Sequence, residues 1–141
     1  MGLDQYAYAV TQGGENDGDE TQLADWRKHN RLQGWMEELW EEKGRPFDGE
    51  KDEGNPMGDF NCVPVELTSI DIDSLEESVL AKELPETGGF FFGNDSFDWE
   101  DENGKPYEEG DYYYKETDIE FIEKARKAIE EGKKVFYNCW W

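Results

Sequence analysis

The chain has 141 residues, of which 36 are Asp or Glu and 14 are Lys or Arg, so its formal net charge is -22. A surface this acidic repels the phosphates of nucleic acids and of anionic membranes, so we expect no direct binding to either. Aromatic residues make up 15% of the sequence, enough apolar area for a folded core, and they separate the chain from disordered acidic tails. We therefore expect one domain over residues 1–141.

The first part of the chain predicts a strand, a helix and two acidic loops. Residues 3–11 combine aromatic and small apolar residues, which is typical of a β-strand. Loops are expected near 12–21 and 44–60, with Gly44 stopping the helix between them. That helix, over 22–43, is indicated by an apolar stripe, with Trp26 on an adjacent track: Leu32, Trp35, Met36, Leu39 and Trp40.

The middle of the chain predicts a short strand, a second helix and a buried strand. Residues 61–67 suit a strand, and Pro64 favours an edge position for it. The next helix is expected to begin near Asp71 or Asp73, because Asp73 and Glu76 have the spacing of a capping box. Leu84-Pro85 ends it, and the apolar run 89–93 predicts a buried strand.

The last part of the chain predicts a hairpin, a third helix and a final strand. Asn103-Gly104 within segment 94–116 is a strong hairpin signal. Thr117 and Glu120 predict a capping box at the start of a helix that Gly132 ends. Residues 135–140 then predict a strand, and Trp140 and Trp141 are expected to be buried, in the core or against a partner. Together these elements predict an α+β domain, a small mixed sheet with about three helices packed on it.

Five short motifs, in this order along the chain, resemble those of a family of small proteins encoded mainly by tailed bacteriophages. They are Met1-Gly2-Leu3-Asp4, Trp26–Asn30, Asn61-Cys62, Leu84–Gly93 and Phe136–Trp140. The resemblance implies phage origin and a single compact domain, and it implies no activity. Two positions depart from the pattern: Gln33 stands where relatives often carry a second histidine, and Cys139 where they more often carry serine.

Residues 26–31 form the one basic island in this acidic chain. On the expected helix, Arg27 and Arg31 are four positions apart and share a face. Cations beside tryptophan would hold a small anion such as a nucleotide by charge and stacking. The alternative is a helix face that pairs with the protein's own carboxylates. The ligand-binding residues expected on the first interpretation are Trp26, Arg27, Lys28, His29 and Arg31.

The acidic, aromatic segment 94–114 is the candidate surface for a protein partner. Aromatic anchors beside charges are typical of interface hot spots, and an acidic field speeds encounter with a basic partner. The alternative is that these aromatic side chains pack a hairpin onto the core. The partner-binding residues expected on the first interpretation are Asp98, Trp99, Glu100, Asp101 and Tyr112.

Signals for catalysis, a metal or a cofactor are weak. His29 is the only histidine, Cys62 is a candidate nucleophile, and nothing in the sequence brings the two together. One histidine and two distant cysteines fall short of a zinc site, and the acidic loops do not fit a calcium loop. No phosphate-binding glycine motif is present. We expect neither a metal nor a cofactor.

Three functions follow, in order of preference. The first is a non-enzymatic phage accessory protein that binds a host protein through an acidic, aromatic surface. The second is a binder of a small anionic ligand at the Trp26–Arg31 island, and the third is a small enzyme using His29 and Cys62. No apolar stretch suits a signal peptide or a membrane span, so we expect the host cytoplasm and no membrane contact. The sequence leaves the oligomeric state open.

Overall fold

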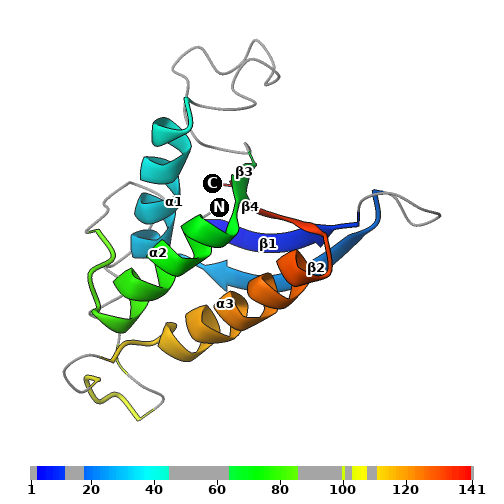
Figure 1. Ribbon diagram of the computed structural model, residues 1–141. Helices are drawn as coiled ribbons and strands as arrows, with labels where there is room; N and C mark the ends of the chain where they lie inside the picture. Colours follow the sequence, from blue (N-terminus) through cyan, green and yellow to red (C-terminus); the bar gives the residue numbers. More distant parts are fainter. Residues whose placement is uncertain are drawn as a thin grey trace.

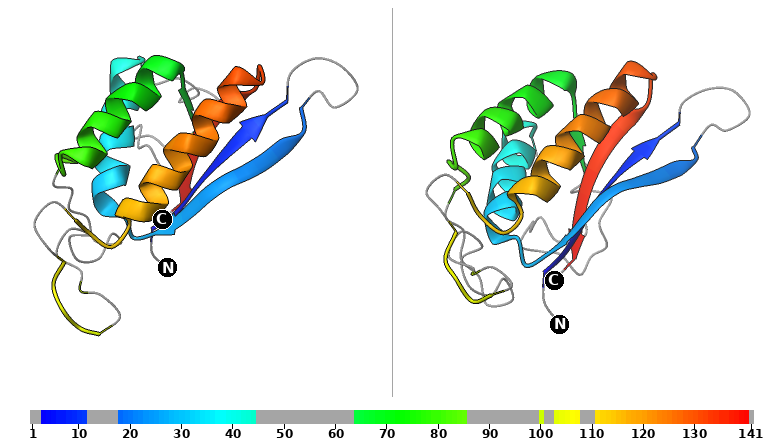
Figure 2. Two further views of the ribbon diagram at one scale, coloured as in Figure 1. Left: turned by 60° about the horizontal axis from the view of Figure 1, so that its bottom comes forward. Right: turned by 90° about the horizontal axis from the view of Figure 1, so that it is seen from below.

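The described part of the chain forms a sheet of four strands with three helices on one side (Figure 1, Figure 2). The computed structural model describes residues 3–11, 18–44, 64–85, 100, 103–107 and 111–140. Within them the element order is β1 (Asp4–Val10), β2 (Glu20–Arg27), α1 (Asn30–Glu42), β3 (Val65–Leu67), α2 (Ser69–Leu80), α3 (Lys115–Glu130) and β4 (Lys134–Trp140). The predicted α+β class is confirmed.

The sheet has the order β2-β1-β4-β3, and all three of its pairings are antiparallel. A mixed sheet was predicted, but β2 pairs back on β1 as a hairpin and β4 runs antiparallel to both of its neighbours. β1 and β4 are therefore the central strands. β3 lies at an edge, as Pro64 predicts.

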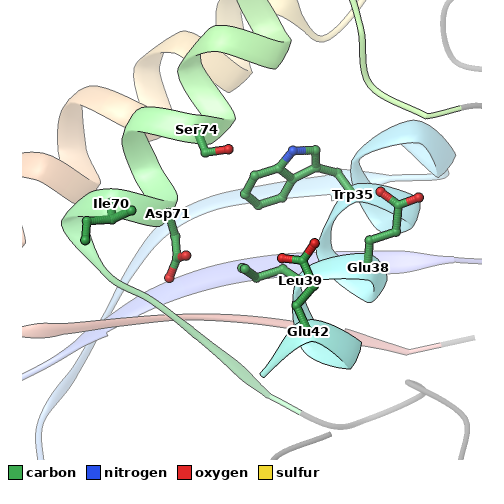
Figure 3. A pocket seen from close by; sticks show the side chains of 7 residues that line it. All are labelled: Trp35, Glu38, Leu39, Glu42, Ile70, Asp71 and Ser74. Atoms are coloured by element: carbon green, nitrogen blue, oxygen red, sulfur yellow. The ribbon is translucent and has the colours of Figure 1, made fainter. Parts of the chain in front are cut away.

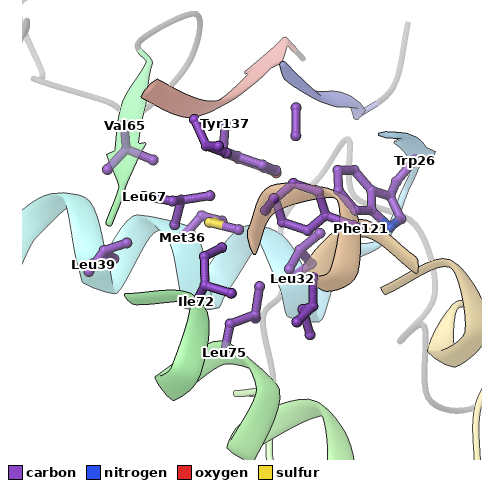
Figure 4. Packing of buried hydrophobic residues seen from close by; sticks show 14 of the residues in the cluster. Trp26, Leu32, Met36, Leu39, Val65, Leu67, Ile72, Leu75, Phe121 and Tyr137 are labelled. Atoms are coloured by element: carbon purple, nitrogen blue, oxygen red, sulfur yellow. The ribbon is translucent and has the colours of Figure 1, made fainter. Parts of the chain in front are cut away.

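The helices cover one face of the sheet. Along β4 the buried residues Val135, Tyr137 and Cys139 alternate with residues on the other face, as the two-residue period of a strand requires. Figure 4 shows Tyr137 and Trp26 from the sheet packed with side chains from all three helices. The helices contribute the largest share of this core: Leu32, Met36, Leu39, Trp40, Ile72, Leu75, Val79, Phe121 and Ile122.

The predicted helix over 22–43 is wrong in its first half. Residues 20–27 form β2, whose register pairs Trp26 with Gln5 and Asp25 with Tyr6. The chain turns from strand to helix at Lys28, whose φ of 57° is in the left-handed region and whose N–H donates to the carbonyl of Leu3. The apolar spacing around Trp26 is compatible with a helix, and pairing with β1 overrides it.

Two predicted helix starts are also wrong, and α2 ends at Leu80, before the predicted stop at Leu84-Pro85, whereas the predicted glycine stops of the other two helices are confirmed. α2 begins at Ser69, because Thr68 and Asp71 form the capping box in place of Asp73 and Glu76. α3 begins at Lys115, before Thr117, and its N-cap Tyr114 makes no side-chain cap. Gly44 and Gly132 follow α1 and α3 with φ of 85°, a conformation that glycine adopts without strain.

The final strand is confirmed, but burial of Trp140 in the core is wrong. The side chain of Trp140 is 63% exposed, because strand alternation turns it away from the helices while Cys139 points inward. Trp141 lies outside the described residues.

Several other predictions fall wholly or partly outside the described residues. They concern the strand at 89–93, most of the loops near 12–21 and 44–60, and about half of the segment 94–116. Around Asn103-Gly104, the described residues show one antiparallel bridge, between Glu100 and Pro106. Among the helices described, none is long and apolar enough to cross a bilayer.

Candidate functional site

The basic island does not present a common face. Trp26 and Arg27 end β2, Lys28 is in the turn, and only Arg31 is on α1, so the two arginines do not share a helix face. Trp26 and His29 are buried, at 3% and 0% exposure. A dissolved ligand has no access to them in this fold, which corrects their assignment as surface ligand-binding residues.

The two arginines of the island bond to separate parts of the protein. The guanidinium of Arg31 donates to the carbonyl of Leu84 at 2.8 Å. Arg27 lies 3.9 Å from the Asp4 carboxylate, and both side chains are more than half exposed. The side chains therefore do not converge on a shared anion site.

His29 and Trp26 instead meet at one buried carboxylate, Asp118 of α3. Trp26 Nε1 donates to Asp118 Oδ1 at 2.8 Å. His29 Nε2 lies 2.8 Å from Asp118 Oδ2, and the hydroxyl of Tyr112 donates to the same oxygen at 2.6 Å. One side chain that is itself 1% exposed thus joins β2, the N-cap of α1 and the segment before α3.

A second set of buried polar side chains continues from this point. The amide of Gln5 donates to the carbonyl of His29 and accepts from its N–H, at 2.9 and 2.8 Å. It also donates to the hydroxyl of Tyr137, which donates in turn to Gln33, and Gln33 donates to the thiol of Cys139. We call these eight residues the Asp118 network: Gln5, Trp26, His29, Gln33, Tyr112, Asp118, Tyr137 and Cys139.

The Asp118 network is satisfied and closed to solvent. In the described part of the chain, every buried side-chain nitrogen or oxygen has a hydrogen-bond partner. Burial, together with the Asp118 carboxylate, raises the pKa of Tyr112 well above its usual range, so this phenol stays protonated as a donor. The arrangement holds elements together and offers no open position to a substrate. Cys62, the other member of the predicted catalytic pair, lies outside the described residues.

Only part of the predicted partner surface lies within the described residues. Tyr112 is 1% exposed, so its assignment as a surface anchor is corrected: its hydroxyl is needed inside by Asp118. Tyr114 also packs inward and stacks on the His29 ring at 4.8 Å. Glu100 is exposed, whereas Asp98, Trp99 and Asp101 lie outside the described residues.

A surface cleft between α1 and α2 is open to a ligand, unlike the buried Asp118 network. Its volume is about 260 Å³, and Figure 3 shows the indole of Trp35 reaching from α1 toward Ser74 on α2. We call it the α1–α2 cleft, and its lining residues are Trp35, Glu38, Leu39, Glu42, Ile70, Asp71 and Ser74. Apolar walls beside several carboxylates give it the character of a site for an organic cation.

The carboxylates of this cleft are in two different states. Asp71 bonds to Lys43 Nζ at 2.7 Å and to the N–H of Thr68 at 2.9 Å. Partial burial raises the pKa of Asp71, but the hydrogen bonds from Lys43 and Thr68 outweigh it and hold the pKa below its ordinary value. Glu38 and Glu42 have no ion-pair partner among the described residues.

The geometry of α1 concentrates this uncompensated charge. Trp35, Leu39 and Glu42 follow one another at four- and three-residue intervals and so share a helix face with Glu38. Glu38 and Glu42 are four apart, a spacing at which like charges destabilise a helix by a few tenths of a kcal/mol. A cation in the cleft would relieve that repulsion. The apolar stripe in the sequence places Trp35 and Leu39 in the core, and no local pattern points to the two glutamates beside them.

No described group of three or more His, Cys, Asp or Glu side chains is arranged to hold a metal ion. Comparisons with protein-family models, curated proteins and solved structures find no match for this chain.

Proposed function

We propose that the protein is a non-enzymatic binding protein that takes a basic protein partner at the α1–α2 cleft. In the phage setting implied by the motif resemblance, that partner is a host protein. The observation that carries the proposal is the cleft itself, where the Trp35 indole lies beside two glutamates that no described cation neutralises. The net charge of -22 favours the same class of partner.

The size and the walls of the cleft define what would enter it. A volume of about 260 Å³ fits one extended side chain and is too small for a folded element. An arginine or lysine side chain matches it, because its stem is apolar and its head is cationic. A cation over an indole contributes roughly 0.5–2 kcal/mol, and the two carboxylates add to this where water is displaced.

The proposal is tested by measuring the affinity of a short peptide that contains arginine and lysine. The variant E38Q/E42Q removes two charges from the cleft and keeps its shape. The matched control, E123Q/E130Q, removes two charges from exposed positions on α3. We expect the cleft variant to weaken binding about tenfold, the equivalent of roughly 1.4 kcal/mol, and the control to weaken it much less.

Equal losses in the two variants would contradict the proposal, because the peptide would then respond only to net charge. The salt dependence of peptide binding also distinguishes binding in the cleft from attraction by net charge alone. Exposed charges are screened over about 8 Å at physiological ionic strength, so attraction by net charge alone falls toward zero as salt is added. Binding that includes a side chain stacked on Trp35 keeps a part that salt does not remove.

A further inference from the structure

The face of the sheet turned away from the helices carries a continuous aromatic stripe. Tyr6 and Tyr8 of β1 point to this outer face, since Gln5, Ala7 and Ala9, which alternate with them, are buried. The rings of Tyr6 and Tyr8 stack with centroids 5.8 Å apart, and those of Tyr8 and Phe136 with centroids 5.6 Å apart. The stripe therefore crosses from one central strand to the other.

Two rings of the outer face are open to solvent. Tyr6 is 39% exposed, and Trp140, which the register places opposite Asp4, is 63% exposed. Exposed aromatic side chains gathered on one face of a monomer mark an interaction surface. A row of stacked rings suits flat partners, which include both nucleobases and the guanidinium groups of arginine.

The charges around the stripe decide between these partners. The register sets Asp25 beside Tyr6, Glu20 beside Val10 and Glu66 beside Phe136, so acidic residues flank the rings on both edge strands. Burial first, then the negative charge of Glu20 and the neighbouring Tyr6, raise the pKa of Tyr8 to about 12. Glu20 therefore acts on the stripe electrostatically. Lys134 and Arg27 oppose this field, and Arg27 lies beside Asp4.

A negative field over aromatic rings attracts cations and repels phosphates. Single-stranded nucleic acid would have to bring its phosphates against that field and against a net charge of -22. A second copy of the chain carries the same net charge and is repelled as well. Arginine is planar and weakly hydrated and stacks on aromatic rings, so it fits both the shape and the charge of the stripe.

We propose that the outer face of the sheet docks an arginine-bearing segment of a basic protein, with its guanidinium groups stacked on Tyr6 and Trp140. This surface lies on the opposite side of the sheet from the helices that form the α1–α2 cleft (Figure 2). The inference therefore stands or falls independently of the proposed function.

The test measures binding of three probes at moderate salt: an oligoarginine peptide, an oligolysine peptide of equal length and an oligothymidylate. We expect oligoarginine to bind most tightly and to quench tryptophan fluorescence, oligolysine to bind more weakly, and the oligothymidylate not to bind. In the E38Q/E42Q background, which removes the charges of the cleft, the further change Y6A/W140A should weaken oligoarginine binding about tenfold. L80A, which trims a 56% exposed side chain on α2, is the matched control and should change nothing.

Three results with these probes would overturn the inference, and a fourth concerns the cleft variant. The three are equal oligoarginine binding with and without Y6A/W140A in the E38Q/E42Q background, equal binding of oligolysine and oligoarginine, and tighter binding of the oligothymidylate. The single variant W140A removes the more exposed ring with the least disturbance and answers the same question if the double variant does not fold. The cleft variant E38Q/E42Q separates the two surfaces, because it should leave quenching by oligoarginine in place. Loss of all oligoarginine binding in that variant would assign the peptide to the cleft instead.

Discussion

Carboxylates lie beside tryptophan both in the interior of this protein and on its surface, with different consequences. In the Asp118 network a carboxylate accepts from an indole and a phenol and contacts an imidazole, and all of these side chains are buried. In the α1–α2 cleft, Glu38 and Glu42 lie beside the indole of Trp35 without a described cationic partner. Tryptophan beside a carboxylate therefore stabilises the fold in the Asp118 network and forms a candidate binding site in the α1–α2 cleft.

The two places differ in whether the carboxylates already have hydrogen-bond or ion-pair partners. A buried carboxylate with all its donors present stabilises the fold and leaves nothing for a ligand to bond to. A surface carboxylate without a partner costs little while water solvates it, and it gains when a cation arrives. Asp71 stands between the two, because it lines the cleft but is already bonded to Lys43 and Thr68.

The largest effect is expected from D118A. This change leaves the donors of Trp26 and Tyr112 buried without an acceptor, so we expect a loss of about 3–5 kcal/mol in the free energy of unfolding. Denaturant unfolding measures it. E38Q/E42Q should leave stability unchanged or raise it by a few tenths of a kcal/mol, since it removes repulsion between like charges. If the two variants destabilised the protein equally, the contrast between network and cleft would be lost.

A smaller effect is expected from Y137F, which tests the far end of the Asp118 network. The hydroxyl of Tyr137 donates to Gln33 and accepts from Gln5, and without it the carbonyl of Gln33 loses a buried donor. We expect a loss of about 1–3 kcal/mol, measured by thermal and denaturant unfolding. Y113F removes a hydroxyl from an exposed tyrosine and should stay within about 0.5 kcal/mol of wild type. A neutral Y137F would mean that the bonds of this network contribute little to stability.

T68A is expected to cost less again. It removes the side-chain half of the capping box, in which the Thr68 hydroxyl accepts from the Asp71 N–H and donates to its carboxylate. The loss should be about 1 kcal/mol by chemical denaturation. The Ser74→Ala variant, later in the same helix, should cost a few tenths of a kcal/mol at most, since Ser74 is exposed there.

The smallest effect is a pH dependence that Asp71 produces. Its folded pKa lies below the ordinary 3.8, so its contribution is fully present above that value and is lost as pH falls through the folded pKa. K43M removes one source of the shift. The stability difference between wild type and K43M should therefore be constant from neutral pH down to about 5 and shrink below about 4. A difference that stayed constant to pH 3 would show that Lys43 does not act through this carboxylate.

Local pattern alone determined several elements of this protein. Alternation and composition predict the strands at 3–11 and 135–140, and the stripe from Leu32 to Trp40 predicts the body of α1. Gly44 and Gly132 predict the ends of α1 and α3, because a positive φ favours glycine whatever the rest of the chain does. These signals depend on neighbours within a few positions, so the sequence contains them in full.

Tertiary structure alone decided the rest. The segment around Trp26 has spacing that suits a helix or a strand, and its pairing with β1 selects the strand. Asp118 meets Trp26 and His29 only because the fold brings together residues 92 and 89 positions apart. The α1–α2 cleft likewise joins Glu38 to Ile70 across separate helices. Such contacts depend on how whole elements pack, and no local pattern in the sequence specifies them. The basic island was therefore predicted as a ligand site, whereas the fold buries its Trp26 and His29 in the core.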